Sequence, residues 1–214
     1  LNENTDENLI KFQRELYTAL HTRHYLVTQD IPPGNTDYNL KSTAAQNDYV
    51  FVMAYDQHYA TSKPGPVGQQ KWIESVINDM EQHIPEEKIV LCLAAYGYDW
   101  AKDSEGGDVT YQEALTTAAE SDGKIKFGND YNLSYSYNDD AGIEHQVYFA
   151  DAATNFNVMM TAQEEGLAGV SLWRLGSEDP RVWSFYRKDL SDKDAKNQLI
   201  DLNQMEFIKG GTNV

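Results

Sequence analysis

The sequence predicts an α/β fold built on parallel strands. Apolar, strand-like runs alternate along most of the chain with amphipathic, helix-like segments, and short links join them. Four such strand–helix units are present, a pattern typical of a parallel sheet or barrel. The chain has 214 residues, which is short for a complete (β/α)8 barrel of ~250 residues.

The first unit is predicted from a helical stripe and a β-rich segment that follows it. Leu9, Phe12, Leu16 and Leu20 fall on one face of a helix over residues 6–21. Residues 25–28 favour a strand that ends at Asp30, before a Pro-Pro-Gly turn. A short helix is expected over residues 38–47.

The second and third strands are predicted as runs buried on both faces. Residues 49–55 and 88–95 are apolar without alternation, as in the strands of parallel sheets. Residues 69–83 form the helix between them, which Pro85 ends. Its inward face is expected to hold Trp72, Ile73, Val76, Ile77 and Met80.

An insertion of about residues 101–150 interrupts the pattern after the third strand. It contains a short helical segment, YQEALTTAAE, and two alternating segments, LSYSYNDD and HQVYF, with a turn at Asp139-Asp-Ala-Gly. Alternation with period two predicts antiparallel strands with one solvated face. We therefore expect a small α+β insertion.

The fourth unit closes the predicted domain of residues 1–190. Asp151 is suited to cap a helix over residues 151–165, and Gly166 lies just beyond its end. A strand over residues 169–172 and a helix from about Pro180 follow. Residues 191–214 form a polar tail, with a helix expected near residues 191–204.

Composition excludes some classes of partner. The chain has 34 acidic and 17 basic residues, a formal net charge of −17, which repels nucleic acid and anionic membranes. This charge suits a neutral or cationic substrate, and it also suits solubility alone. No apolar run reaches the ~20 residues of a membrane span. Because the chain opens with a polar segment and Leu1, we interpret it as a piece of a longer protein.

Neither cysteine nor histidine indicates a metal or redox site, so no metal or cofactor is expected. Cys92 is the only cysteine, and its apolar surroundings predict a buried, inert thiol. His21 and His24 come nearest to a metal-ligand spacing, but they flank a predicted helix end and are expected at the surface.

Chemistry is expected at the carboxyl ends of the strands, where parallel barrels carry their functional residues. Three neighbouring ends hold aromatic residues beside carboxylates: Met53-Ala-Tyr-Asp56, Tyr96-Gly-Tyr-Asp-Trp100 and Trp173-Arg-Leu-Gly-Ser-Glu-Asp179. Aromatic faces pack on sugar rings, and carboxylates accept hydrogen bonds from sugar substituents. The pattern therefore favours a carbohydrate site.

Each of these residues also has a structural interpretation. Trp173 is suited to fill a core, and Asp56 to cap a turn. Glu178 and Asp179 precede Pro180 as residues at the start of a helix do. Tyr98 and Trp100 are placed to pack under the insertion, where Tyr148 and Asp151 are also suited to structural roles.

The motifs resemble those of glycoside hydrolase family 18. The segment VFVMAYDQH resembles the family's sixth-strand Met-x-Tyr-Asp motif. KWIESVINDMEQHIPEEKIVLCLAAYGYDW is similar to the helix, seventh strand and Tyr-Gly of spore-cortex and chitinase-like members, and GLAGVSLWRLGSEDP to the eighth strand with its tryptophan. The resemblance covers residues 5–187. It implies strands five to eight of a (β/α)8 barrel, with the insertion after strand seven.

The resemblance also implies roles for individual residues. Tyr55 and Asp56 would hold the 2-acetamido group of the sugar, Met53 would line the same pocket, and Trp173 would form its floor. Tyr96 and Trp100 would serve neighbouring subsites. The implied reaction is retaining hydrolysis of β-1,4-linked N-acetylglucosamine polymers, in which the acetamido oxygen attacks the anomeric carbon. A glutamic acid would protonate the leaving oxygen.

One departure from the family limits the expected activity. The Asp-x-x-Asp-x-Asp-x-Glu motif, which supplies the general acid from the fourth strand, occurs nowhere in the sequence. We therefore expect this chain to be inactive alone. The alternatives are a family 18-like domain that binds glycan without cleaving it, and a self-sufficient enzyme that uses Asp56 with Glu178.

The resemblance carries expectations about context as well. The segments WRLGSEDP and DAATNFN are similar to segments of bacterial multidomain proteins that join a polysaccharide deacetylase, a family 18 domain and a glycosyltransferase. An extracytoplasmic or cell-envelope location is expected. Because half a barrel exposes strand edges and an apolar sheet face, we expect self-association, unless the insertion and tail shield that face.

Overall fold

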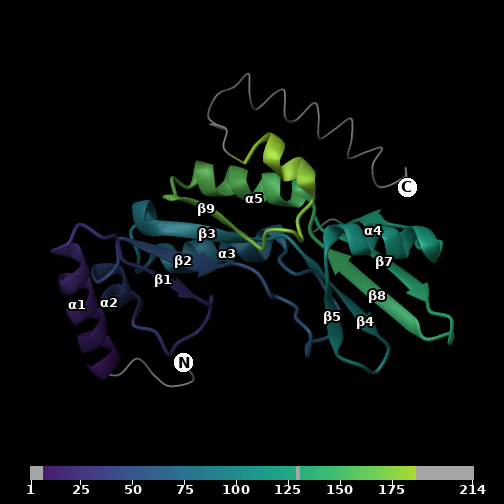
Figure 1. Ribbon diagram of the computed structural model, residues 1–214, viewed down its shortest axis with the longest axis horizontal. Helices are drawn as coiled ribbons and strands as arrows, with labels where there is room; N and C mark the ends of the chain where they lie inside the picture. The colour runs from purple at the N-terminus through teal and green to yellow at the C-terminus, as the bar shows by residue number, and fades with distance from the viewer. Residues whose placement is uncertain (1–6, 129–130, 187–214) are drawn as a thin grey trace.

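The chain folds around two sheets that lie next to each other (Figure 1). The structure is a computed structural model, and it describes residues 7–128 and 131–186. The first sheet is parallel, with the order β1-β2-β3-β9. Its strands are β1 (Thr28–Ile31), β2 (Tyr49–Met53), β3 (Ile89–Ala94) and β9 (Gly169–Trp173).

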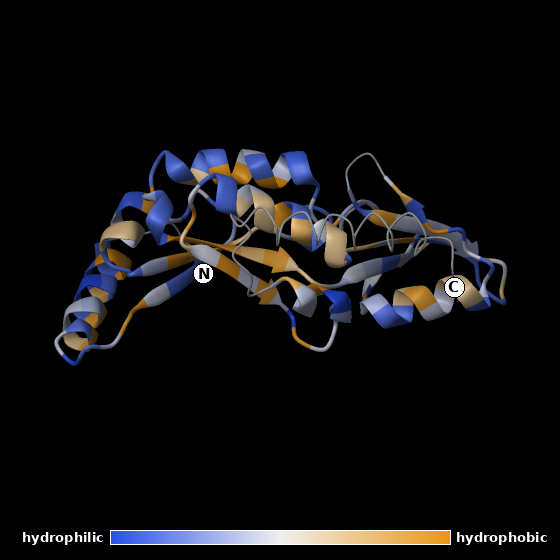
Figure 2. Cartoon of the chain, turned by 90° about the horizontal axis from the view of Figure 1, so that it is seen from above, coloured by the Kyte–Doolittle hydropathy of each residue, from blue (hydrophilic) through white to orange (hydrophobic). Residues whose placement is uncertain are grey.

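Helices connect these strands and cover one face of the parallel sheet. They are α2 (Leu40–Ala45), α3 (Gln70–Glu81) and α5 (Ala152–Glu164), with the 3-10 turn η1 (Glu86–Lys88) before β3; α1 (Glu7–His21) precedes β1 and lies beside α2, and the 3-10 turn η2 (Pro180–Ser184) follows β9. Side chains of α3 and α5 form one core with alternate residues of β2 and β3, such as Val52 and Leu91, which are fully buried. Figure 2 shows the apolar colour on the central strands of this sheet.

The remaining side chains of the parallel sheet form its inner face, opposite the helices. Because paired residues in parallel strands point the same way, the register places Met53, Cys92 and Ser171 in one row across this face. Trp173 lies beside Ala94 in the row above. Four parallel strands with this cover of helices confirm the predicted partial (β/α)8 barrel, and in the described residues β1 and β9 are its outer strands.

The insertion forms a sheet of its own with the order β5-β4-β8-β7-β6. Its elements are β4 (Gly97–Ala101), β5 (Gly106–Val109), α4 (Tyr111–Glu120), β6 (Lys126–Phe127), β7 (Leu133–Asn138) and β8 (Glu144–Phe149). The predicted turn is confirmed, since Gly142 N–H donates to the Asp139 carbonyl at 2.9 Å. The second sheet begins at Gly97, earlier than expected, because the chain after β3 pairs at once with β8.

The predicted helix ends of the fourth unit are confirmed. The Asp151 side chain accepts a hydrogen bond from Thr154 N–H at the start of α5, and Gly166 takes a positive φ of 73° after its end. Asp179 caps η2, with Pro180 in its first turn. The structure gives η2 as a 3-10 helix over these residues. Residues 191–204 lie outside the described residues.

Two features of the first unit differ from expectation. The strand predicted from residue 25 to Asp30 begins only at Thr28 and ends at Ile31, and Tyr25 and Leu26 are 61% and 68% exposed. The start of this strand is set by its pairing with β2, in which Thr28 lies opposite Tyr49, and not by the apolar character of residues 25–27. The apolar stripe of α1 is partly open to solvent, with Phe12 58% exposed. No helix among the described residues is long and apolar enough to cross a bilayer.

Candidate functional site

The carboxyl end of β2 presents Tyr55 and Asp56. Asp56 takes a φ of 59°, in the left-handed region that Asp tolerates better than most residues. The loop beyond it is closed by backbone and side-chain bonds, since Gln57 N–H donates to the Val67 carbonyl at 2.8 Å and Gln69 N–H donates to the Gln57 side-chain oxygen at 2.9 Å. The loop thus fixes the turn on which the Asp56 carboxylate stands.

Two tyrosines that follow β3 meet this carboxylate. The hydroxyl groups of Tyr96 and Tyr98 both donate to Oδ1 of Asp56, the second at 3.1 Å. The Tyr55 and Tyr96 rings meet edge to face, with centroids 6.1 Å apart. The structure therefore joins residues from two strand ends into one cluster of phenols around a carboxylate.

Burial and neighbouring charge keep these phenols protonated. Burial is the main cause that raises the pKa of Tyr55 and of Tyr96 well above the ordinary value of 10.0, and the neighbouring Asp56 raises both further. The same causes raise the pKa of Tyr98 to about 12. All three hydroxyls are neutral at neutral pH. Tyr96 and Tyr98 donate theirs to Asp56, so the Tyr55 hydroxyl is the one suited to donate to a carbonyl or hydroxyl group of a ligand.

Trp173 stands at the end of β9 with its ring open. It lies in register with Ala94, and its carbonyl accepts a hydrogen bond from Ala95 N–H at 2.7 Å. Its side chain is on the inner face and is 54% exposed, so it does not fill a core. The next residue, Arg174, pairs with Asp108 of β5 at 3.0 Å, which links this strand end to the second sheet.

Trp100 is placed differently from the other predicted site residues. It is 2% exposed in the second sheet, between the rings of Tyr98 and Tyr148, whose centroids lie 5.3 and 6.2 Å away. A Cβ on Gly106 would come within 2.6 Å of its Nε1. The buried indole has no open face for a sugar, so the structure matches its interpretation as packing under the insertion.

The loop after β9 contains carboxylates with structural partners. Glu178 accepts hydrogen bonds from Gly176 N–H and, at 3.2 Å, from the Trp183 indole. Asp179 is 1% exposed and accepts from Ala152 N–H at 3.0 Å and from Arg181. Asp179 thus joins η2 to α5, and Glu178 joins the loop to η2, in line with the structural interpretation of the sequence.

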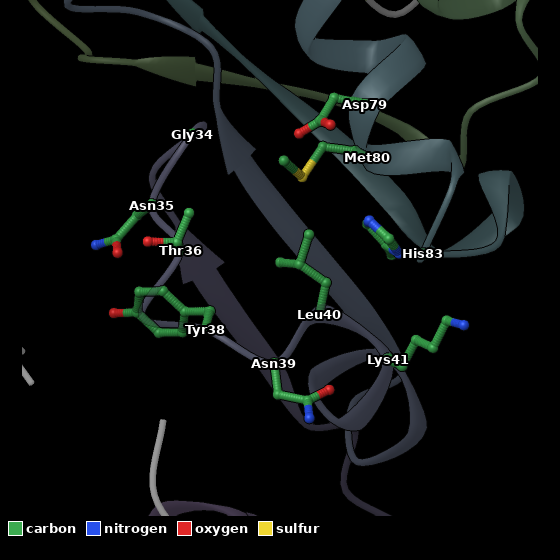
Figure 3. Close-up of a pocket in the computed structure, with 10 residues that line it drawn as sticks. All are labelled: Gly34, Asn35, Thr36, Tyr38, Asn39, Leu40, Lys41, Asp79, Met80 and His83. Atoms are coloured by element: carbon green, nitrogen blue, oxygen red, sulfur yellow. The ribbon is translucent and has the colours of Figure 1, made fainter. Parts of the chain in front are cut away.

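A hollow of about 450 Å³ lies away from this rim, between the loop after β1 and the end of α3. In Figure 3, Leu40 and Met80 lie in the middle of this hollow. Thr36 of the loop stands on one side of them, and Asp79 and His83 of the facing segment stand on the other. This hollow shares none of its lining residues with the rim of Tyr55, Asp56 and Trp173. No group of three or more His, Cys, Asp or Glu side chains is arranged to hold a metal ion in the part of the chain that the structure describes.

The sequence did not single out Tyr98 as a site residue, yet its hydroxyl contacts Asp56. The signal that identifies it is the alternation in Tyr96-Gly-Tyr-Asp-Trp100, which places its three aromatic side chains on one side of an extended strand. Their rings follow one another, with Tyr96 and Tyr98 centroids 5.6 Å apart. Tyr98 thereby belongs both to the site and to the packing of the insertion.

Comparisons with known proteins agree with this geometry. The protein named as sporulation-specific glycosylase YdhD of Bacillus subtilis is 30% identical over 176 residues, which cover 77% of this chain and 42% of that protein. A cortical fragment-lytic enzyme of Bacillus anthracis is 23% identical, over 81% of this chain and 44% of its own length. The chain thus spans about half the length of these curated relatives.

The fold is also that of solved family members. The crystal structure of a chitinase from Chromobacterium violaceum superposes with a TM-score of 0.78 and 27% identity, over 83% of this chain and 59% of that one. The family model of glycosyl hydrolases family 18 matches residues 2–179. The match agrees with the parallel strands, with the insertion after the third strand and with the Tyr-Asp pair that follows β2. The chain therefore belongs to glycosyl hydrolases family 18.

Proposed function

We propose that this chain forms the acetamido-holding side of a glycosidase site that acts on β-1,4-linked, N-acetylglucosamine-containing glycans. Tyr55 and Asp56 hold the 2-acetamido group, Met53 lines the pocket, and Trp173 forms its floor. Tyr96 serves an adjoining position. The hydrolysis is retaining and substrate-assisted, because the held acetamido oxygen is placed to attack the anomeric carbon.

The observation that carries this proposal is the cluster at the rim. An ionisable carboxylate, three neutral phenols and an open indole lie at the ends of β2, β3 and β9. A carboxylate accepts the acetamide N–H, a phenol donates to the acetamide carbonyl, and an indole face packs on the apolar side of the sugar. The names of the relatives, a chitinase and a cortical fragment-lytic enzyme, support the same substrate class.

The same cluster provides no general acid. Asp56 is engaged by two phenols, and Glu178 is held within the loop before η2. We therefore propose that this chain binds the glycan but does not hydrolyse it by itself. A lectin-like, non-catalytic role remains the second candidate function, since the open rim suits binding equally well.

Calorimetric titration of the purified chain with N,N′,N″-triacetylchitotriose tests binding, and a parallel assay for released sugars tests hydrolysis. We expect binding, no hydrolysis, and a loss of about tenfold in affinity for Asp56→Asn, since removing one charged hydrogen-bond acceptor costs about 1.4 kcal/mol or more. Asp122→Asn is the matched control, because Asp122 is also exposed with a positive φ of 54°. Equal affinity of the Asp56 variant and the wild type contradicts the proposal.

We further propose that the inner face of the parallel sheet takes part in self-association. It carries partly exposed apolar side chains such as Tyr49, beside the outer strand β1. Size exclusion with light scattering should show species larger than a monomer, and a clean monomer contradicts this.

We also propose an extracytoplasmic location for the whole protein, which the relatives named for cortex lysis support.

A further inference from the structure

Both phenolic hydroxyls of the rim converge on a single oxygen of Asp56. Oδ1 accepts from Tyr96 and, at 3.1 Å, from Tyr98. Among the described residues, no side chain or backbone group donates to Oδ2, and no basic side chain lies within ion-pair distance of this carboxylate. One oxygen is therefore occupied by the protein, and the other has no hydrogen-bond donor among the described residues, although Asp56 itself is exposed.

The second donor is held in place by the insertion. Tyr98 lies in β4, where its ring packs against the buried ring of Trp100 with centroids 5.3 Å apart. Gly97, on the other side of the strand, lets β4 approach β8 so closely that a Cβ there would lie 2.3 Å from the Tyr148 carbonyl oxygen. The insertion thus fixes the strand, and the strand fixes the Tyr98 hydroxyl.

Asp56 needs such support because it does not lie in the sheet itself. It stands beyond the end of β2 on a turn with a positive φ of 59°, and its side chain is exposed. An exposed carboxylate rotates freely about its side-chain bonds unless hydrogen bonds hold it. Hydrogen bonds to a charged acceptor are about twice as strong as those between neutral groups, so two phenols restrain this rotation.

We propose that Tyr98 is a positioning residue: together with Tyr96 it holds Oδ1 of Asp56, so that Oδ2 alone is left to accept a hydrogen bond from the bound glycan. This inference rests on the proposed function for the identity of the ligand. It assigns to the insertion a direct part in the site, because the residue that orients Asp56 belongs to the second sheet.

The hydrogen bonds are tested first without ligand. The side-chain carboxyl carbon of Asp56, observed by 13C NMR in the full chain at pH 7, should change its chemical shift in Tyr98→Phe. Tyr148→Phe is the matched control, since Tyr148 pairs with Tyr98 across β4 and β8 but does not contact Asp56. An unmoved resonance in Tyr98→Phe, in a chain with the wild-type Tm, overturns the proposal.

The positioning role is tested by a double-mutant cycle with triacetylchitotriose as the probe. Tyr98→Phe should weaken binding about tenfold in the wild-type background, but hardly at all in the Asp56→Asn background, because both changes act through one group. Equal losses in the two backgrounds overturn the positioning role, since they mean that Tyr98 acts independently of Asp56. Failure of the proposed function is distinct: Asp56→Asn then binds like the wild type, and the positioning role falls with it.

Discussion

The backbone N–H of Ala95 donates to the carbonyl oxygen of Trp173 at 2.7 Å. This bond joins the chain beyond β3 to the last residue of β9, and so places an open indole beside the residue that precedes Tyr96. Backbone pairing, rather than contacts of the ring, therefore holds Trp173 at the rim. Its side chain is available for a ligand, and substitutions there separate binding from folding.

Trp173→Ala should abolish much of the glycan affinity while it leaves the fold intact. The indole is 54% exposed, so its removal creates no cavity. Loss of an aromatic stacking face costs about 1 kcal/mol beyond the buried area, and we expect a fall of roughly tenfold or more in affinity. Calorimetry and thermal unfolding measure the two effects.

Trp183→Ala is the control for this substitution. Trp183 is similarly exposed, at 46%, but lies in η2 and donates to Glu178. It should bind triacetylchitotriose like the wild type. A comparable loss of affinity in both variants would show that the glycan contacts exposed tryptophans in general and not the rim in particular.

Asp151→Asn should make the chain more stable near neutral pH. Complete burial raises the pKa of Asp151 from its ordinary value of 3.8 to about 6, although Thr154 donates hydrogen bonds that oppose the rise. Because the folded chain favours the protonated carboxyl, the contribution of this group to stability is full below pH 3.8 and is lost as pH rises through about 6. Asparagine stays neutral and retains an oxygen that accepts from Thr154 N–H.

Chemical denaturation at several pH values measures this effect. The difference in free energy of unfolding between Asp151→Asn and the wild type should grow in favour of the variant between pH 4 and 7, by up to about 3 kcal/mol, because one pKa unit corresponds to about 1.4 kcal/mol. Parallel pH profiles for the two chains would mean that the charged form of Asp151 is not disfavoured by burial.

Gly97→Ala should disrupt the junction between the sheets. A Cβ at this position would lie 2.3 Å from the Tyr148 carbonyl oxygen and 2.7 Å from the Phe149 Cα, both rigid backbone atoms. Overpacking of this kind costs about 1–3 kcal/mol, and it should also displace Tyr98. Gly107→Ala, where a Cβ meets nothing within 4 Å, should unfold at nearly the wild-type Tm; equal Tm values for all three chains contradict the close approach.

Cys92 should resist thiol reagents in the folded chain. Its side chain is 6% exposed, and burial, together with the charge of Asp30, raises the pKa of the thiol to about 12. Only the thiolate reacts readily, so labelling at pH 8 should be slow in buffer and fast in denaturant. Complete labelling within minutes under native conditions would show that the inner face opens beside Cys92.

The strands that carry the rim are predictable from sequence. Continuous apolar runs such as those of β2 and β3 fit an α/β fold only as strands between two layers, and the described bounds fall within the predicted ranges. Helix α3 is equally predictable, since its buried face repeats with helical spacing. The start of β1 is not predictable, because residues Thr28–Ile31 are mostly polar and pairing with β2 defines where the strand begins.

The site is predictable only in part. Tyr55 and Asp56 come just after β2 and Trp173 ends β9, so their place at one rim follows from topology. The contact of Tyr98 with Asp56 joins residues 42 positions apart, and it depends on how the second sheet meets the first. For the same reason, the motif leaves two places open for Trp100, at the rim or packed under the insertion, and only the second sheet decides for the buried one.

The central claim is that the rim formed by Tyr55, Asp56 and Trp173 binds an N-acetylglucosamine glycan. NMR titration of the isotope-labelled chain with triacetylchitotriose tests it most directly. We predict that shift changes gather on residues 53–56, 94–98 and 171–175, with saturation. Saturable changes confined to the hollow between α3 and the loop after β1, or no changes at millimolar ligand, would contradict it.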